Sequence, residues 1–213
     1  MFQTDLRDQL AKGRSSSIVA YPSDSLLAYP ALVEFVGDRL PEGRFVILGE
    51  SFSGPIAVEI AARLPDKVAG VILAASFVRR PVAFGNSLAR AWLSARLPRF
   101  RAVISAGLFG QFATPERTRI LQEALNIVPH QTFAFRIGEI ASVDKRRRLS
   151  DVQCPLLYMH GRRDVVVRRN AMQTVLNASQ TGTAAYVDGP HAFLTTHVAE
   201  SVAAVEAFVA TLP

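Results

Sequence analysis

Residues Phe45 to Pro65 read FVILGESFSGPIAVEIAARLP and combine a strand, a tight turn and a helix in immediate succession. The apolar run at the start is typical of a buried strand, and apolar residues recur with helical spacing from Gly54 onward. Between them lies Ser51, with the small residues Gly49 and Ser53 on either side. A serine on such a turn requires small neighbours, because the backbone passes very close to itself there. The stretch therefore predicts an α/β protein with a candidate nucleophile at Ser51.

Ser53 is the competing serine in this turn. If Ser53 were the nucleophile, Pro55 would occupy the position that needs a small residue, so the sequence favours Ser51. The backbone N–H of Phe52 and the N-terminus of the helix would then face an oxyanion formed at Ser51. The alternative interpretation is an ordinary strand-to-helix turn with a capping serine.

The rest of the chain alternates between predicted strands and predicted helices. Because the strands are apolar throughout, they predict a mostly parallel sheet that is covered by helices on both faces. The predicted strands are Ser17–Tyr21, Arg44–Leu48, Val68–Phe77, Pro155–Met159 and Ala184–Val187. The predicted helices are Leu27–Leu40, Gly54–Leu64, Val166–Asn177 and Val198–Leu212, and residues 1–13 also have helical character.

The region between Arg79 and Ser150 interrupts this alternation. It contains no convincing strand, and its spacing predicts three helices instead, at Leu88–Leu97, Pro115–Ile127 and Gln131–Val143. It also holds 13 Lys and Arg against 4 Asp and Glu, whereas the remainder holds 11 against 14. We therefore expect residues 1–78 and 151–213 to form the core and residues 79–150 to form an all-helical cap insertion.

Composition narrows the class of protein. The single cysteine, Cys154, excludes an internal disulfide and a cysteine-based metal cluster. No apolar run reaches the length of a membrane span, and Asp5 and Asp8 stand where a signal peptide would be apolar, so a cytoplasmic protein is expected. The net charge of +6 is concentrated in residues 79–150, which argues against a uniformly basic nucleic-acid binder.

Two further side chains follow predicted strands and complete a possible catalytic triad. Asp164 lies in the loop after Pro155–Met159, and His191 lies in a Gly-Pro loop after Ala184–Val187. The carboxyl ends of parallel strands share one edge of the sheet, which is where α/β proteins place their sites. The order serine, aspartate, histidine fits a nucleophile, an orienting acid and a base. Alone, each of the last two is equally well a turn aspartate or a surface histidine.

The chain resembles an α/β-hydrolase with a helical cap, on the strength of residues 49–54, 155–164 and 189–191. The resemblance implies a carboxylesterase, lipase or thioesterase that uses Ser51, Asp164 and His191 and needs no metal or organic cofactor. It also implies two or three strands and an oxyanion loop ahead of Ser17–Tyr21, which this sequence does not supply. We therefore expect N-terminal strands to be missing and the sheet to have an exposed edge, which favours pairing between chains.

The resulting hypothesis is a serine hydrolase that cleaves a small-molecule carboxylic ester or thioester through an acyl-enzyme. The alternatives are an acyltransferase with the same triad, and a non-catalytic or truncated relative. The arginines of residues 79–150 would suit an anionic substrate or an acidic carrier protein, although a solvated outer face is the simpler interpretation both for them and for the run Lys145–Arg148. Of the three other histidines, His130 and His197 are interpreted as surface residues. The sequence leaves the oligomeric state open.

Overall fold

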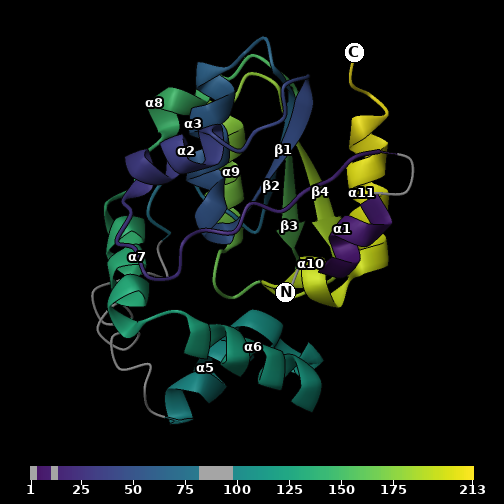
Figure 1. Ribbon diagram of the computed structural model, residues 1–213. Coiled ribbons are helices and arrows are strands. Elements are labelled where there is room, and N and C mark those ends of the chain that lie inside the picture. Colours follow the sequence, from purple (N-terminus) through teal and green to yellow (C-terminus); the bar gives the residue numbers. More distant parts are fainter. Residues whose placement is uncertain (1–3, 11–13, 82–97) are drawn as a thin grey trace.

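A computed structural model describes residues 4–10, 14–81 and 98–213. Its centre is a four-stranded parallel sheet in the order β1-β2-β3-β4 (Figure 1). The strands are β1 (Phe45–Glu50), β2 (Val68–Ala74), β3 (Leu156–Gly161) and β4 (Gly182–Val187). They correspond to the last four predicted strands, with ends shifted by up to three residues. The predicted α/β architecture is therefore confirmed.

Helices cover both faces of this sheet (Figure 1). One layer contains α2 (Tyr29–Gly37), α3 (Gly54–Arg63), α8 (Arg146–Leu149) and α9 (Arg169–Ala178), and the other contains α1 (Thr4–Leu10), α10 (Phe193–Thr196) and α11 (Val198–Val209). Successive side chains along a strand point to opposite faces of the sheet, so each strand packs against both helical layers. Val71 and Leu73 of β2 join the core beneath α3, whereas Ile72 and Ala74 pack with α11.

Between β2 and β3 the described chain forms helices at the carboxyl end of the sheet (Figure 1). They are α5 (Pro98–Phe109), the 3-10 turn η2 (Gly110–Phe112), α6 (Pro115–Ile127) and α7 (His130–Ser142). Two of the three predicted helices are thus observed, and the third, Leu88–Leu97, lies outside the described residues. A core of Ile104, Phe109 and Leu121 joins α5 to α6. The short helix α8 packs against α3 and α9 instead.

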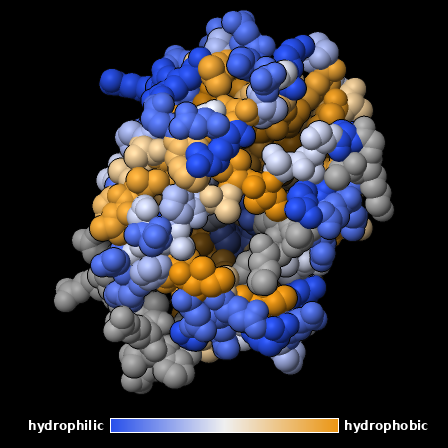
Figure 2. Space-filling model, viewed as in Figure 1, coloured by the Kyte–Doolittle hydropathy of each residue, from blue (hydrophilic) through white to orange (hydrophobic). Residues whose placement is uncertain are grey.

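The predicted strand at Ser17–Tyr21 is wrong. These residues have no regular secondary structure, and they pair with no strand in the part of the chain that the structure describes. A strand needs a hydrogen-bonding partner as well as an apolar sequence, and Ile18 remains 47% exposed instead of entering the core. In the described sheet β1 and β4 are therefore the two edge strands. Figure 2 shows hydrophobic side chains gathered on the surface over β1 and toward α11.

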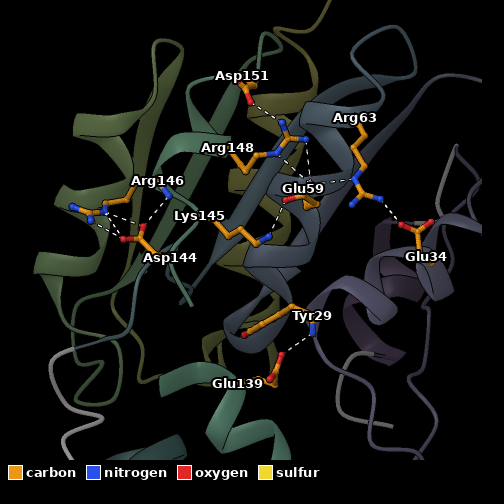
Figure 3. A network of polar contacts seen from close by, with 10 residues as sticks. All are labelled: Tyr29, Glu34, Glu59, Arg63, Glu139, Asp144, Lys145, Arg146, Arg148 and Asp151. Atoms are coloured by element: carbon orange, nitrogen blue, oxygen red, sulfur yellow. Dashed lines mark hydrogen bonds and ion pairs between the residues drawn. The ribbon is translucent and has the colours of Figure 1, made fainter. Parts of the chain in front are cut away.

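The charge run at Lys145–Arg148 is also not simply a solvated face. Lys145 Nζ lies 2.9 Å from Glu59 Oε2, and Arg148 Nη2 lies 3.1 Å from Glu59 Oε1 (Figure 3). Arg63, one turn along α3, contacts the same carboxylate at 3.1 Å. These ion pairs fasten α8 and the residue before it to α3, so part of the run is structural.

No helix in residues 4–10, 14–81 or 98–213 is long and apolar enough to cross a membrane.

Candidate active site

Ser51 lies on the turn that the sequence predicts, between the end of β1 at Glu50 and the start of α3 at Gly54. Its φ of +47° is in the left-handed region, which is strained for a residue with a Cβ atom. The turn is as tight as expected. A Cβ atom on Gly49 would come within 2.8 Å of the Gly54 Cα atom, and one on Gly54 would lie 1.8 Å from Ser76 Oγ. Both glycines are therefore needed for this backbone path.

Ser76 holds the strained turn from the neighbouring strand. It follows β2, and its hydroxyl donates a hydrogen bond of 2.7 Å to the Ser51 carbonyl oxygen. The Ser76 carbonyl in turn accepts a hydrogen bond from the buried Tyr158 hydroxyl of β3. No sequence motif points to this role, apart from the small side chain of Ser76 at the end of a strand.

Two tyrosines from the segment before β1 fasten the residues after Ser51. The Tyr29 hydroxyl donates to the Phe52 carbonyl oxygen at 3.2 Å, and the Tyr29 ring stacks on the Phe52 ring at 4.8 Å between centroids. The Tyr21 hydroxyl donates to Ser53 Oγ at 2.8 Å. Burial is the main cause that raises the pKa of both hydroxyls, so they remain protonated donors. Sequence reasoning missed both residues, because neither belongs to a recognisable motif.

The structure brings the three predicted triad residues together. His191 Nε2 lies 3.0 Å from Ser51 Oγ, and His191 Nδ1 lies 2.8 Å from Asp164 Oδ2. Serine and histidine are 140 residues apart in the sequence, and histidine and aspartate are 27 apart. When Nδ1 donates its proton to the carboxylate, the neutral ring keeps a lone pair on Nε2, directed at the serine hydroxyl. This is the geometry of a serine with an adjacent oriented base.

Asp164 is itself fixed by the backbone that follows it. Its Oδ1 accepts hydrogen bonds of 2.8 Å from the N–H groups of Val166 and Val167, and its side chain is fully buried. The loop after β3 thus folds around its own carboxylate before α9 begins, which is typical behaviour for aspartate at a helix entrance. Oδ2 is left to accept from His191.

The loop that carries His191 is also tied to α5. The N–H of Ala192, the next residue, donates a hydrogen bond of 2.9 Å to the Leu108 carbonyl oxygen. Further along, the ring of His197 packs edge-on against Phe112 at 4.6 Å, and its Nδ1 lies 2.8 Å from Thr196 Oγ1. His197 is therefore engaged away from Ser51, and His130 begins α7.

Phe52, the predicted oxyanion donor, directly follows Ser51 in the 3-10 turn that leads into α3. The role of its N–H stays a prediction, as does the source of a second donor. Across residues 4–10, 14–81 and 98–213, no group of three or more His, Cys, Asp or Glu is arranged to hold a metal ion.

Comparisons with known proteins give the same class of fold and enzyme. Residues 12–195 match the family model described as serine aminopeptidase, S33. A pimeloyl-[acyl-carrier protein] methyl ester esterase of Xylella fastidiosa is 30% identical over 88% of this chain and 78% of that protein. A biotin biosynthesis bifunctional protein of Cellvibrio japonicus is 28% identical over 90% of this chain, which spans only 40% of that protein's length.

Solved structures support the fold at low sequence identity. A bromoperoxidase from Bacillus anthracis superposes with a TM-score of 0.79 and 15% identity over 98% of this chain and 85% of that one. An enol-lactonase from Burkholderia xenovorans gives a TM-score of 0.73 and 17% identity over 87% of this chain and 74% of that one.

Proposed function

This chain belongs to the serine aminopeptidase S33 family of α/β-hydrolases and is an esterase-type hydrolase, and we propose that it cleaves carboxylic esters with Ser51, His191 and Asp164. The observation that carries the proposal is the continuous chain of contacts from Ser51 Oγ through both ring nitrogens of His191 to Asp164 Oδ2. Each of the three residues comes from a different strand end, so their meeting requires the whole sheet.

The first half of the reaction forms an acyl-enzyme. His191 Nε2 accepts the Ser51 proton while Oγ attacks the ester carbonyl carbon, and the carbonyl oxygen becomes an oxyanion beside the Phe52 N–H. The tetrahedral intermediate collapses when His191 returns the proton to the leaving alcohol oxygen. Asp164 keeps the ring oriented and stabilises the imidazolium while it carries the proton.

The second half releases the acid. His191 Nε2 takes a proton from a water molecule, whose oxygen attacks the acyl carbonyl carbon. The bond to Ser51 Oγ then breaks as Oγ regains its proton from His191, so the carboxylic acid leaves and the free enzyme is restored. No electrons are exchanged and no cofactor takes part in this scheme.

We propose an acyl chain borne on an acyl carrier protein, with its ester at the reacting end, as the substrate class. Two observations favour it. The relatives at 28–30% identity include esterases named for such substrates, and residues 79–150 carry 13 basic against 4 acidic residues. Carrier proteins are acidic, so those basic residues that are not paired internally, as Lys145 and Arg148 are with Glu59, would speed their encounter with the enzyme. A rise from about 20 mM to 300 mM salt should then lower kcat/KM for the carrier-bound ester, and leave a neutral ester of equal acyl length nearly unchanged.

A fluorophosphonate probe tests the nucleophile directly. The folded protein should become labelled at Ser51, as read by mass spectrometry of the peptide, and Ser51→Ala should remove the label. Ser53→Ala is the matched control, since Ser53 lies in the same turn but contacts Tyr21 instead of His191. The proposal would be contradicted if Ser53→Ala lost the label while Ser51→Ala kept it, or if the folded protein took up no probe.

A further inference from the structure

A polar pocket lies at the carboxyl end of β3 and β4, where it adjoins Asp164 but is not lined by Ser51. It has a volume of about 500 Å³ and is lined by His160, Arg162, Asp164, Arg169 and Tyr186. His160 and Tyr186 are directly opposite each other in the register of β3 and β4. Arg162 lies in the loop after β3, and Arg169 is the first residue of α9.

The two arginines of this pocket have no carboxylate partner within 4 Å in the part of the chain that the structure describes. Arg162 lies over the Tyr186 ring, with its Cζ atom 4.5 Å from the ring centroid. The neighbouring Arg163, by contrast, is neutralised by Asp188 at 2.9 Å and does not line the pocket. Guanidinium groups that face one pocket without a counter-charge favour an anionic ligand.

The acid that lines the pocket does not cancel this charge by ion pairing. Both oxygens of Asp164 are already occupied, Oδ2 by His191 and Oδ1 by the N–H groups of Val166 and Val167. Its oxygens therefore accept from the backbone of its own loop and from His191, and they form no ion pair with Arg162 or Arg169.

His160 supplies a second, independent indication of a ligand. It is only 5% exposed, yet its Nδ1 has no hydrogen-bond partner. Buried polar atoms are normally paired, so the unpaired Nδ1 leaves a hydrogen bond unmade on a residue that lines the pocket. Burial is the main cause that lowers the pKa of His160, opposed by Asp164 and assisted by Arg169 and Arg162. Burial therefore favours the neutral ring, which has one N–H to donate.

The beginning of α9 adds a third source of positive potential. This helix has ten residues, and no side chain caps its first turn at Arg168. The N–H groups at the start of an α-helix, together with the helix dipole, attract anions.

From these features we propose that the pocket binds a phosphate-type oxyanion between Arg162 and Arg169, with His160 and the first turn of α9 as additional donors. The two arginines stand at opposite ends of the loop that carries Asp164. A bound oxyanion would bridge them and hold that loop closed around the triad acid. This binding does not depend on ester hydrolysis, so it can be measured without any ester substrate.

Thermal unfolding of the full chain with inorganic phosphate tests this proposal. At ten times its Kd, phosphate should raise Tm by about 3–5 °C over sodium chloride of equal ionic strength. Arg162→Gln and Arg169→Gln should each weaken binding about tenfold or more, because each removes charge-assisted hydrogen bonds. Arg168→Gln is the matched control: it removes an arginine beside Arg169 that does not line the pocket, and its Kd should stay within about threefold.

Titration with glycerol 3-phosphate separates two sources of the ligand. Equal affinity for this ester and for phosphate would identify the phosphate group alone as the recognised unit, and tighter binding of the ester would identify an organic phosphate. The proposal is overturned if phosphate gives no shift beyond that of chloride, or if Arg168→Gln weakens binding as much as the two lining variants.

Discussion

Two buried carboxylates, Asp164 and Glu59, hold different parts of this molecule in different ways. Glu59, in the middle of α3, is surrounded by the permanent cations Lys145, Arg148 and Arg63 (Figure 3). Asp164, at the edge of the sheet, accepts from two neutral backbone N–H groups and from a histidine. Their side chains are similarly hidden, at 8% and 0% exposure.

The difference lies in what the partners can do. Lysine and arginine keep their charge at neutral pH, so the Glu59 cluster has one protonation state and fixes α8 against α3. Histidine can gain and lose a proton near neutral pH, so the Asp164 pair is suited to support proton transfer at Ser51. We therefore expect substitutions at Asp164 to affect activity and substitutions at Glu59 to affect stability.

The largest effect is expected from Asp164→Asn. The amide cannot hold His191 in the tautomer that accepts the serine proton, so kcat on a p-nitrophenyl ester should fall by about 10⁴. Because triad residues act as a unit, combining this change with Ser51→Ala should lower kcat little beyond the worse single variant. Activity assays measure kcat, and circular dichroism spectra that match the wild type show that each variant is folded. Wild-type turnover by a folded Asp164→Asn variant would show that Asp164 does not support activity, and would so contradict its contrast with Glu59.

The next effect is the loss of stability in Glu59→Ala. Three cations would lose their common partner, and the partly buried Lys145 would keep an unpaired charge, so the free energy of unfolding should fall by about 2–4 kcal/mol. Urea denaturation measures it, and kcat per folded molecule should be unchanged. Glu34→Ala is the matched control, because Glu34 is 71% exposed and binds only Arg63, so its loss should cost less than about 1 kcal/mol.

The pH dependence of stability follows from the same cluster. Burial of Glu59 opposes its ionisation, but hydrogen bonds from Lys145 and Arg148 outweigh this and lower its pKa from 4.5 to about 2. A lowered pKa in the folded state stabilises the protein above pH 4.5, and this contribution is lost as the pH falls toward 2. It amounts to at most about 3 kcal/mol, and less where water screens the exposed arginines.

Urea titrations at several pH values between about 2 and 6 measure this contribution. The slope of the unfolding free energy against pH should become shallower in Glu59→Gln than in the wild type. Equal slopes in the two proteins would show that Glu59 is not the group responsible.

The smallest effect is expected at the serine turn, from Tyr29→Phe. This change removes only the hydroxyl that donates to the Phe52 carbonyl oxygen, and it keeps the stacked ring. The loss of one hydrogen bond is worth about 1 kcal/mol, so kcat should fall by about fivefold with KM unchanged if the turn loosens around the oxyanion site. Tyr21→Phe, whose hydroxyl reaches only the Ser53 side chain, should change kcat less. A larger loss of kcat in Tyr21→Phe than in Tyr29→Phe would show that Tyr21 is the main support of the turn.

The sequence by itself determined the parts of this protein that depend on neighbours along the chain. A strand, a tight turn and a helix between Phe45 and Pro65 need only local residues, so Ser51 and the glycines of its turn could be predicted. Asp164 and His191 could be predicted as well, since parallel strands bring their carboxyl ends to one edge whatever the details of packing. The match of β1 to β4 with the predicted strands has the same origin.

Only the tertiary structure decided the features that depend on which surfaces meet. Ser17–Tyr21 has a strand's composition but no partner strand among residues 4–10, 14–81 and 98–213, and no local signal reports that absence. From the sequence, Glu59 resembles a helix surface residue. In the structure, Lys145 and Arg148, which are 86 and 89 residues away along the chain, pair with it. The supports at Tyr29 and Ser76 are equally invisible, because a hydrogen bond between distant segments is fixed by their packing and leaves no spacing in the sequence to detect.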